Sequence, residues 1–358
     1  MNLDQRLNLV KEVGEEIITE EELKKLFESG EKLIAYDGFE PSGQIHIAQG
    51  ILRAVNINKI TKAGIKFKML VADWHAMANN KMGGDLEKIQ TVGQYFIEVW
   101  KASGMDLDNV EFVWASDLVK NSDYWKLVLQ VAKTNTLRRF IRTAEIMGRR
   151  ESLDLSAAQI IYPCMQIADI FTLGAQITQL GMDQRKVNVL AREIGPILGY
   201  WKPVIVSHHM LLGLGKPPPS ILERTERILA LKMSKSKPEN AIFMTDTEED
   251  IKRKIERAWA PERVVEENPI LEYYRYIVFE KFDKVVIERP EKFGGPVTFD
   301  SYDELEKLYA QKAIHPQDLK NTLVYLLNQI LEPVREHFRK NTEARLLLEK
   351  VKNYEITR

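Results

Sequence analysis

The chain has 358 residues, and its 51 Lys and Arg nearly balance 52 Asp and Glu to give a formal net charge of −1. A chain of this length can form one or two domains around a large core. The near-neutral charge excludes a generally basic nucleic-acid-binding protein, so any RNA must be met by a local patch. Cys164 is the single cysteine, which excludes intrachain disulfides and cysteine metal clusters and favours a reducing, cytoplasmic setting. No apolar run approaches the roughly 20 residues of a membrane span.

Strand and helix patterns alternate through the first two thirds of the chain. Residues 2–30 show helical spacing, and a second helix is expected from about His46. Further helices are predicted at 85–103 and 122–148, and short strands at 33–36, 67–72, 110–115, 204–207 and 241–244. Strands that alternate with helices favour right-handed crossovers and a mostly parallel, Rossmann-like sheet. In such sheets ligands bind beyond the carboxyl ends of the strands.

The pattern changes near residue 247. Thr247 is followed three residues later by Asp250, which is a helix-capping arrangement. Helical patterns then dominate, at 301–311, 316–340 and 343–352. We therefore expect an α/β domain over residues 1–246 and a smaller, mainly helical domain over residues 247–358.

The most informative motif lies just before the predicted strand at 241–244 and reads Lys232-Met233-Ser234-Lys235-Ser236. Lysine offers a compact, mobile positive charge and serine a short hydrogen-bond donor, so this composition suits the binding of a polyphosphate. The alternative is a solvated basic turn, because Lys- and Ser-rich loops occur on many protein surfaces.

A second candidate phosphate site is the glycine-containing turn after the first predicted strand. Gly43 and Gly50 would let a ligand approach the backbone closely. The amino terminus of a helix presents free N–H groups and a partial positive charge to an anion. His46, followed by Ala48 and Gln49, would donate a hydrogen bond to a phosphate there. The alternative is a histidine that only caps its own helix.

A polar stripe interrupts an otherwise apolar segment between residues 161 and 169. Tyr162, Gln166 and Asp169 are spaced i, i+4 and i+7, so they share one face of a helix. Buried polar groups are costly unless they are paired, so such a face meets either a ligand or an internal hydrogen-bond network. A short turn that follows supplies Asp183 and Gln184.

The histidine turn and the lysine loop together resemble the two ATP-handling motifs of class I aminoacyl-tRNA synthetases. In that family the motifs hold ATP and stabilise the departing pyrophosphate, which implies catalytic roles for His46, Lys232 and Lys235. The family usually has His-Ile-Gly-His, so Ala48 and Gln49 are departures from it. The resemblance implies that ATP enters with Mg²⁺ as a substrate complex, with no metal fixed by the protein and no tightly bound cofactor. The implied ATP site consists of Gly43, His46, Ala48, Gln49, Lys232, Met233, Ser234, Lys235 and Ser236.

Five segments narrow the resemblance to one amino-acid specificity: 36–43, 162–169, 181–186, 292–295 and 315–321. Over nearly the whole chain they are similar to tyrosyl-tRNA synthetases of the archaeal and eukaryotic type. The resemblance implies that Tyr36 and Asp169 hydrogen-bond the phenol of tyrosine. Phenylalanine would leave those two groups unpaired. The other residues implied to surround tyrosine are Leu70, His75, Tyr162, Gln166 and Gln184.

The implied reaction joins tyrosine to ATP with release of pyrophosphate and then transfers tyrosyl to the 3′ end of tRNA(Tyr). The attacking carboxylate is already anionic, so positioning and charge stabilisation are expected to replace a general base.

RNA contacts and a homodimer are also implied. Residues 121–150 carry a local basic patch, although for any single arginine a solvated helix face is equally compatible. The resemblance implies that this patch meets the acceptor stem and that an aromatic and a carboxylate hold an anticodon base. The residues so assigned are Arg138, Arg139, Arg142, Phe293 and Asp318.

Three alternatives remain at this point. A tryptophanyl-tRNA synthetase would share the fold and the loop; the pair Tyr36 and Asp169 favours a phenol, but a carboxylate can also accept an indole N–H. A non-catalytic RNA-binding paralogue is expected to lose the lysine loop or the polar pocket, and this chain has both. A general nucleotide-binding α/β protein does not explain the similarity after residue 247.

Overall fold

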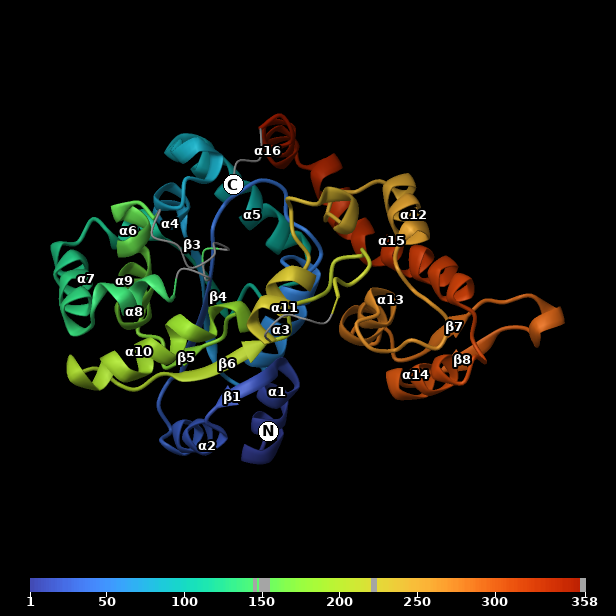
Figure 1. Ribbon diagram of the computed structural model, residues 1–358, viewed down its shortest axis with the longest axis horizontal. Helices are drawn as coiled ribbons and strands as arrows, with labels where there is room; N and C mark the ends of the chain where they lie inside the picture. The colour runs from blue at the N-terminus through green and yellow to red at the C-terminus, as the bar shows by residue number, and fades with distance from the viewer. Residues whose placement is uncertain (144–146, 148–154, 220–223, 355–358) are drawn as a thin grey trace.

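The computed structural model describes residues 1–143, 147, 155–219 and 224–354 (Figure 1). Its centre is a six-stranded sheet in the order β1-β6-β5-β2-β3-β4. β1 runs antiparallel to β6, and the other neighbouring strands are parallel. This arrangement confirms the predicted α/β class. The strands are β1 (Gly14–Ile18), β2 (Ile34–Phe39), β3 (Lys66–Val71), β4 (Val110–Trp114), β5 (Ile177–Thr178) and β6 (Val204–His208).

Successive side chains of the central strands enter two different hydrophobic cores. Ala35 of β2 packs in a core with α1 (Leu3–Val13), α3 (Ile51–Lys62) and α5 (Leu86–Ala102). The next residue, Tyr36, packs on the opposite face with α7 (Ser122–Thr134), α9 (Ala157–Thr172) and α10 (Arg185–Ile197). This alternation is the two-residue period of a strand that is buried on both faces. The shorter helices α2 (Glu20–Glu28), α4 (Asp73–Ala78), α6 (Ala115–Leu118), α8 (Leu137–Ile141) and α11 (Arg224–Leu231) connect or flank these layers.

The expectation of one helix over residues 2–30 is wrong. Gly14 ends α1, the edge strand β1 follows, and Thr19 caps α2 by accepting a hydrogen bond from the backbone of Glu22. The β-branched pair Ile17 and Ile18 fits a strand better than a helix. Pairing with β6, nearly 200 residues away along the chain, decides between the two conformations.

Two boundaries around the candidate phosphate sites also differ from expectation. The helix expected from about His46 begins at Ile51, so His46 lies in the turn before α3. The apolar run at 241–244 is not a strand; its Phe243 forms an isolated antiparallel bridge with His46. The helix expected at 122–148 is divided into α7 and α8, and residues 144–146 and 148 of that range lie outside the described residues.

The part of the chain after residue 247 is mainly helical, as predicted (Figure 1). It contains α12 (Glu248–Arg257), α13 (Pro269–Tyr273), α14 (Tyr302–Ala310), α15 (Pro316–Lys340) and α16 (Thr342–Lys352). It also has a small antiparallel pair, β7 (Val285–Ile287) with β8 (Val297–Phe299), that the sequence did not indicate. The first hydrophobic core continues through Met244, Ile251 and Ile255, and α15 and α16 contact α5. The domain boundary near 247 therefore stays a prediction.

Candidate active site

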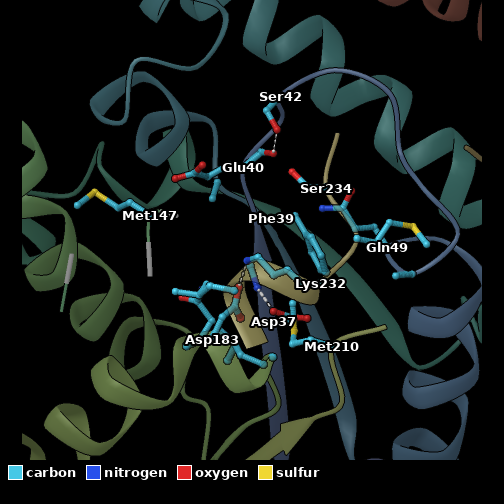
Figure 2. Close-up of a pocket in the computed structure, with 18 of the residues that line it drawn as sticks. Asp37, Phe39, Glu40, Ser42, Gln49, Met147, Asp183, Met210, Lys232 and Ser234 are labelled. Carbon is cyan, nitrogen blue, oxygen red and sulfur yellow. Dashed lines mark hydrogen bonds and ion pairs between the residues drawn. The ribbon is translucent and has the colours of Figure 1, made fainter. Parts of the chain in front are cut away.

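A cavity of about 1060 Å³ opens at the carboxyl ends of the parallel strands (Figure 2). This is the edge at which open α/β sheets bind ligands. Every residue expected around tyrosine lines it: Tyr36, Leu70, His75, Tyr162, Gln166, Asp169 and Gln184. The residues expected around ATP line the same cavity, with the exception of Gly43: His46, Ala48, Gln49, Lys232, Met233, Ser234, Lys235 and Ser236.

The floor of the cavity is organised around the carboxylate of Asp169 on α9, which is 1% exposed. Tyr124 donates a hydrogen bond from its hydroxyl to Asp169 Oδ1 at 2.9 Å. His75 Nε2 lies 2.9 Å from Asp169 Oδ2. Burial lowers the pKa of His75, but the charge and hydrogen bond of Asp169 outweigh burial and raise the pKa above its ordinary value. The carboxylate is therefore held in a fixed orientation by two neighbouring helices.

Tyr36 presents an unsatisfied hydroxyl to this floor. The side chain is fully buried, and the hydroxyl makes no hydrogen bond of good geometry with any residue that the structure describes. Burial raises the pKa of Tyr36 well above its usual value, and the charges of Asp169 and Asp37 act in the same direction. Such a neutral, unpaired hydroxyl is costly in isolation and is ready to bond a ligand hydroxyl.

Two glutamines and an aromatic pair form the wall above the floor. Gln166 Nε2 donates to Gln184 Oε1 at 3.1 Å. The rings of His75 and Tyr162 meet edge to face, with centroids 5.1 Å apart. Burial raises the pKa of Tyr162 well above its usual value, and the charge of Glu40 adds to the effect. The spacing of α9 thus brings its polar side chains to one cavity, as the sequence predicted.

His46 also lines the cavity, and it lies in a turn that is hydrogen-bonded to residues 241–244. Ile47 donates its backbone N–H to Ile242 at 2.8 Å, and Met244 donates to Ile45 at 2.9 Å. Burial lowers the pKa of His46 well below its ordinary value, and Lys235 and Lys232 lower it further. The imidazole is therefore neutral at pH 7, so it can contribute a hydrogen bond to an anion rather than a charge.

The lysine loop follows α11 and lines the cavity, where Lys232 and Ser234 are seen beside the other lining residues (Figure 2). Lys232 Nζ donates to Asp183 Oδ2 at 2.6 Å. Lys235 Nζ lies 3.4 Å from Ser42 Oγ and 4.5 Å from the centre of the Phe96 ring. Burial lowers the pKa of Lys235 to about 7, and the charge of Lys81 acts in the same direction. The charge of Glu40 opposes this shift. Lys235 is thus a buried amine rather than a solvated surface lysine, and an anion nearby would favour its charged form.

Gly43 does not line the cavity, so its expected contact with ATP stays a prediction. Its φ angle of +104° lies in the region that favours glycine, so the residue shapes the turn that carries Ser42 and His46. Gly50 is required for packing: a Cβ there would lie 2.3 Å from the sulfur of Met244.

The sequence did not single out Tyr124 or a buried ionic cluster under the cavity. Arg53 on α3 is 1% exposed and lies 3.0 Å from Asp37, 3.1 Å from His208 Nδ1 and 2.6 Å from Gln179 Oε1. Burial raises the pKa of Asp37 to about 7, with Arg53 opposing the shift. The sequence does contain a signal for this cluster: an arginine within a largely apolar helix. A buried charge needs a partner, so such an arginine indicates a buried ion pair.

The residues expected to contact RNA lie outside the cavity. The three arginines lie on or just after α8 and are exposed, and one of them, Arg139, pairs with Glu193 at 2.5 Å. Phe293 is 61% exposed in the loop between β7 and β8, which projects from the molecule (Figure 1). Asp318 is half-buried in the first turn of α15. The further basic residues Arg149 and Arg150 lie outside the described residues.

Among the described residues there is neither a cluster of metal-binding side chains nor a membrane-spanning helix. No group of three or more His, Cys, Asp and Glu side chains is placed to hold a metal ion. None of the helices is both long and apolar enough to cross a membrane.

Comparison with known proteins agrees with this geometry. The model of the family "tRNA synthetases class I (W and Y)" matches residues 28–332, so the chain belongs to this family. The chain is 50% identical to tyrosine–tRNA ligase 1, cytoplasmic, of Arabidopsis thaliana, over 99% of the chain and 90% of the relative. It is 43% identical to the tyrosine–tRNA ligase of Thermococcus kodakarensis, over 98% and 99% of the two chains. The crystal structure of tyrosyl-tRNA synthetase from Pyrococcus horikoshii, complexed with L-tyrosine, superposes with a TM-score of 0.91 at 41% identity, covering 98% of this chain and 100% of that one.

Proposed function

We propose that the chain is a tyrosine–tRNA ligase, which forms tyrosyl-adenylate from tyrosine and ATP and transfers tyrosyl to tRNA(Tyr). The proposal rests mainly on one observation. A buried carboxylate, Asp169, and an unpaired buried hydroxyl, Tyr36, share one cavity with the neutral His46 and the lysine loop. Its full-length similarity to proteins named tyrosine–tRNA ligase supports the same reaction.

The floor of the cavity selects the amino acid. The phenol of tyrosine would donate to Asp169 and accept from Tyr36, which would satisfy both groups. Phenylalanine would leave the Tyr36 hydroxyl buried without a partner, at a cost of about 1–3 kcal/mol, and would give Asp169 no hydrogen bond beyond those it already has. Leu70 and His75 would contact the ring, while Tyr162, Gln166 and Gln184 would hold the ammonium group.

The histidine turn and the lysine loop act on ATP, which binds as its Mg²⁺ complex. His46 would donate a hydrogen bond to a phosphate, and Lys232 and Lys235 would neutralise the charge that develops on the leaving pyrophosphate. The tyrosine carboxylate attacks the α-phosphate; its new bond to phosphorus forms as the bond to pyrophosphate breaks. Because the nucleophile is already an anion, the reaction needs no general base, and the positioning of the two substrates supplies much of the rate acceleration. Asp183, which binds Lys232 in the free protein, would release it when ATP arrives.

The second step needs RNA contacts and an assembled enzyme. Exposed Arg138, Arg139 and Arg142 would meet the acceptor stem, and Phe293 with Asp318 would hold an anticodon base. A homodimer is supported by apolar side chains that stand exposed on the neighbouring helices α7, α8 and α9, namely Leu129, Leu137 and Ile161. The word cytoplasmic in the plant relative's name supports the same location for this chain.

A tryptophan-specific enzyme is the nearest alternative, because the matching family includes both specificities. The pairing of Tyr36 with Asp169 favours a phenol, which both donates and accepts, over an indole N–H, which only donates. The test is ATP–pyrophosphate exchange with tyrosine, tryptophan or phenylalanine as the sole amino acid. Exchange with tyrosine alone is expected, and exchange with tryptophan would replace the proposed specificity.

A further inference from the structure

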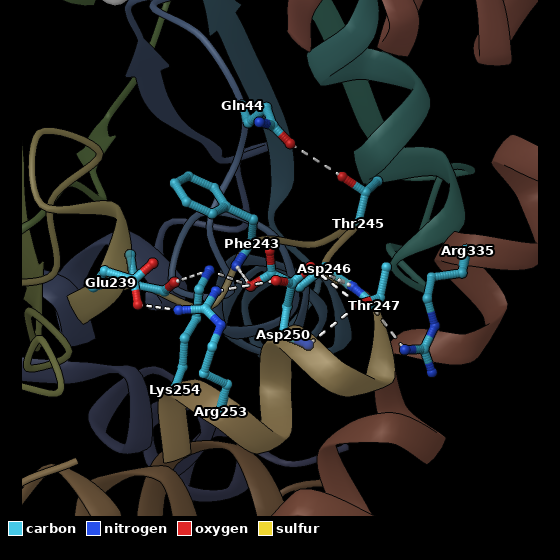
Figure 3. A network of polar contacts seen from close by, with 11 residues as sticks. Gln44, Glu239, Phe243, Thr245, Asp246, Thr247, Asp250, Arg253, Lys254 and Arg335 are labelled. Atoms are coloured by element: carbon cyan, nitrogen blue, oxygen red, sulfur yellow. Dashed lines mark hydrogen bonds and ion pairs between the residues drawn. The ribbon is translucent and has the colours of Figure 1, made fainter. Parts of the chain in front are cut away.

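A buried ion pair connects α12, in the carboxyl-terminal part, to the segment that follows the lysine loop (Figure 3). Lys254 is only 4% exposed. Its ammonium donates to Asp246 Oδ2 at 2.7 Å and to the backbone carbonyl of Ala241 at 2.9 Å. It also lies 4.8 Å from the centre of the Phe243 ring. Asp246 Oδ2 in turn accepts the backbone N–H of Phe243 at 2.9 Å.

The segment held by this pair touches both phosphate-handling elements. Five residues before Ala241 is Ser236, the last residue of the lysine loop. Phe243 bridges His46, and flanking hydrogen bonds join Ile242 to Ile47 and Met244 to Ile45. A displacement of residues 241–246 would therefore move the histidine turn and the end of the lysine loop together.

We propose that Lys254 is a positioning residue for the activation step: by bonding Ala241 and Asp246 it holds the histidine turn and the lysine loop in register with each other. The inference rests on the proposed function. Lys254 does not line the cavity, so it touches no substrate and acts through the backbone of residues 241–246. Arg335 of α15 adds a bond to the carbonyl of Asp246 at 3.3 Å, so two helices of the carboxyl-terminal part meet at this segment.

The alternative is that the pair only stabilises the fold. Removing one partner of a buried pair leaves the other uncompensated, whereas neutral residues of similar size in place of both are often tolerated. The two roles therefore separate in the double variant Lys254→Met with Asp246→Asn. The asparagine can still accept from Phe243, but the carbonyl of Ala241 loses its donor.

The experiment compares wild type, Lys254→Met, the double variant and Lys252→Met by two measurements. Lys252→Met is the matched control, because Lys252 is an exposed lysine on the same helix. The first measurement is tyrosine binding without ATP, by calorimetry. The second is tyrosine-dependent ATP–pyrophosphate exchange, resolved into kcat and the KM for ATP, well below each variant's melting temperature.

We expect Lys254→Met and the double variant to bind tyrosine with wild-type affinity but to lose exchange activity by about 100-fold, the effect of misplacing reacting groups by about 1 Å. Lys252→Met should match wild type. If Lys254→Met does not fold, the double variant alone decides. The proposal is overturned if the folded double variant exchanges at the wild-type rate, or if it fails to fold or to bind tyrosine, because the pair would then hold the whole fold. Wild-type protein without exchange would instead refute the proposed function.

Discussion

At the floor of the cavity, side chains from two helices and a strand surround the carboxylate of Asp169. Asp169 receives a hydrogen bond from Tyr124 and lies beside His75, while the hydroxyl of Tyr36 makes no hydrogen bond of good geometry with the described residues. Tyr124 and His75 fix the orientation of the carboxylate before any substrate binds. Recognition of a phenol then needs little rearrangement, which lowers its cost.

Substitution of Tyr36 by phenylalanine tests the selective role of this hydroxyl. Tyr36→Phe removes one partner of the phenol and leaves the fold's packing intact, so kcat/KM for tyrosine should fall by the equivalent of about 1–3 kcal/mol. Activity with phenylalanine should not fall, so discrimination between the two amino acids should shrink. Tyr274→Phe is the control, because it removes another buried hydroxyl that bonds Leu319 far from the cavity. An unchanged discrimination ratio in Tyr36→Phe would contradict the role.

Lys235 should take up a proton when ATP·Mg²⁺ binds. Burial lowers the pKa of Lys235 to about 7 in the free protein, so the amine is largely neutral at about pH 8. The phosphates favour the charged form, which raises the pKa and draws in close to one proton. At about pH 6 the ammonium is already charged, and no uptake is expected.

Calorimetry in buffers of different ionisation enthalpy measures this uptake. Lys235→Met should abolish it, and Lys252→Met, which removes an exposed lysine that does not line the cavity, should not. Uptake that persists in Lys235→Met would assign the proton to another group.

At the scale of elements, the sequence predicted those whose pattern is set by their own residues. α5, α14, α15 and α16 and the strands β2, β3, β4 and β6 lie where periodicity places them. β1 and β5 were missed because pairing with distant strands decides them: β1 also fits a helix, and β5 has only two residues. The same reason explains which residues of the candidate site could be predicted from the sequence. Motifs within one segment revealed the loop and the polar face of α9. The contacts of Tyr124 with Asp169 and of Arg53 with Asp37 join residues that are distant in the sequence, so only the fold reveals them.

His209 contacts β1, α13 and Tyr276, and the stability that these contacts contribute depends on pH. Its ring lies 2.9 Å from Glu15 of β1 and 3.1 Å from Glu272 of α13, and it stacks on Tyr276. Burial lowers the pKa of His209, but the hydrogen bonds and charges of the two glutamates outweigh burial and raise the pKa to about 9. Its stabilising contribution is therefore complete below the unfolded-state pKa of about 6.5 and is lost as the pH rises through about 9.

Thermal unfolding between about pH 6 and about pH 10 tests this linkage. The melting temperature of wild type should fall more steeply over this range than that of His209→Gln. His315→Gln, which alters an exposed histidine, should follow wild type. Parallel curves for wild type and His209→Gln would show that the three-element contact contributes no pH-dependent stability.

For the whole molecule, the catalytic cavity and the proposed anticodon contacts lie in different parts of one continuous structure (Figure 1). Of the residues that the structure describes, those lining the cavity all precede position 238. Phe293 lies in the loop between β7 and β8 and does not contribute to it. Tyrosine activation and RNA recognition should therefore be separable by substitution.

Phe293→Ala should impair charging of tRNA and leave ATP–pyrophosphate exchange unchanged. Stacking of a base on an aromatic ring contributes about 1–3 kcal/mol, so the KM for tRNA should rise roughly 5- to 150-fold. Tyr325→Ala, which removes an equally exposed aromatic from α15, is the control. If Phe293→Ala charges tRNA as well as the control does, the anticodon contact lies elsewhere.

The central claim is that one cavity joins a tyrosine site to a lysine loop that drives adenylate formation. The direct measurement is mass spectrometry of the small molecule bound to the protein after incubation with tyrosine and ATP·Mg²⁺ in the absence of tRNA. Wild type should retain tyrosyl-adenylate, whereas Lys232→Ala should bind tyrosine normally and form almost none. Undiminished tyrosyl-adenylate in Lys232→Ala, or its absence from a wild-type protein that binds both substrates, would contradict the claim.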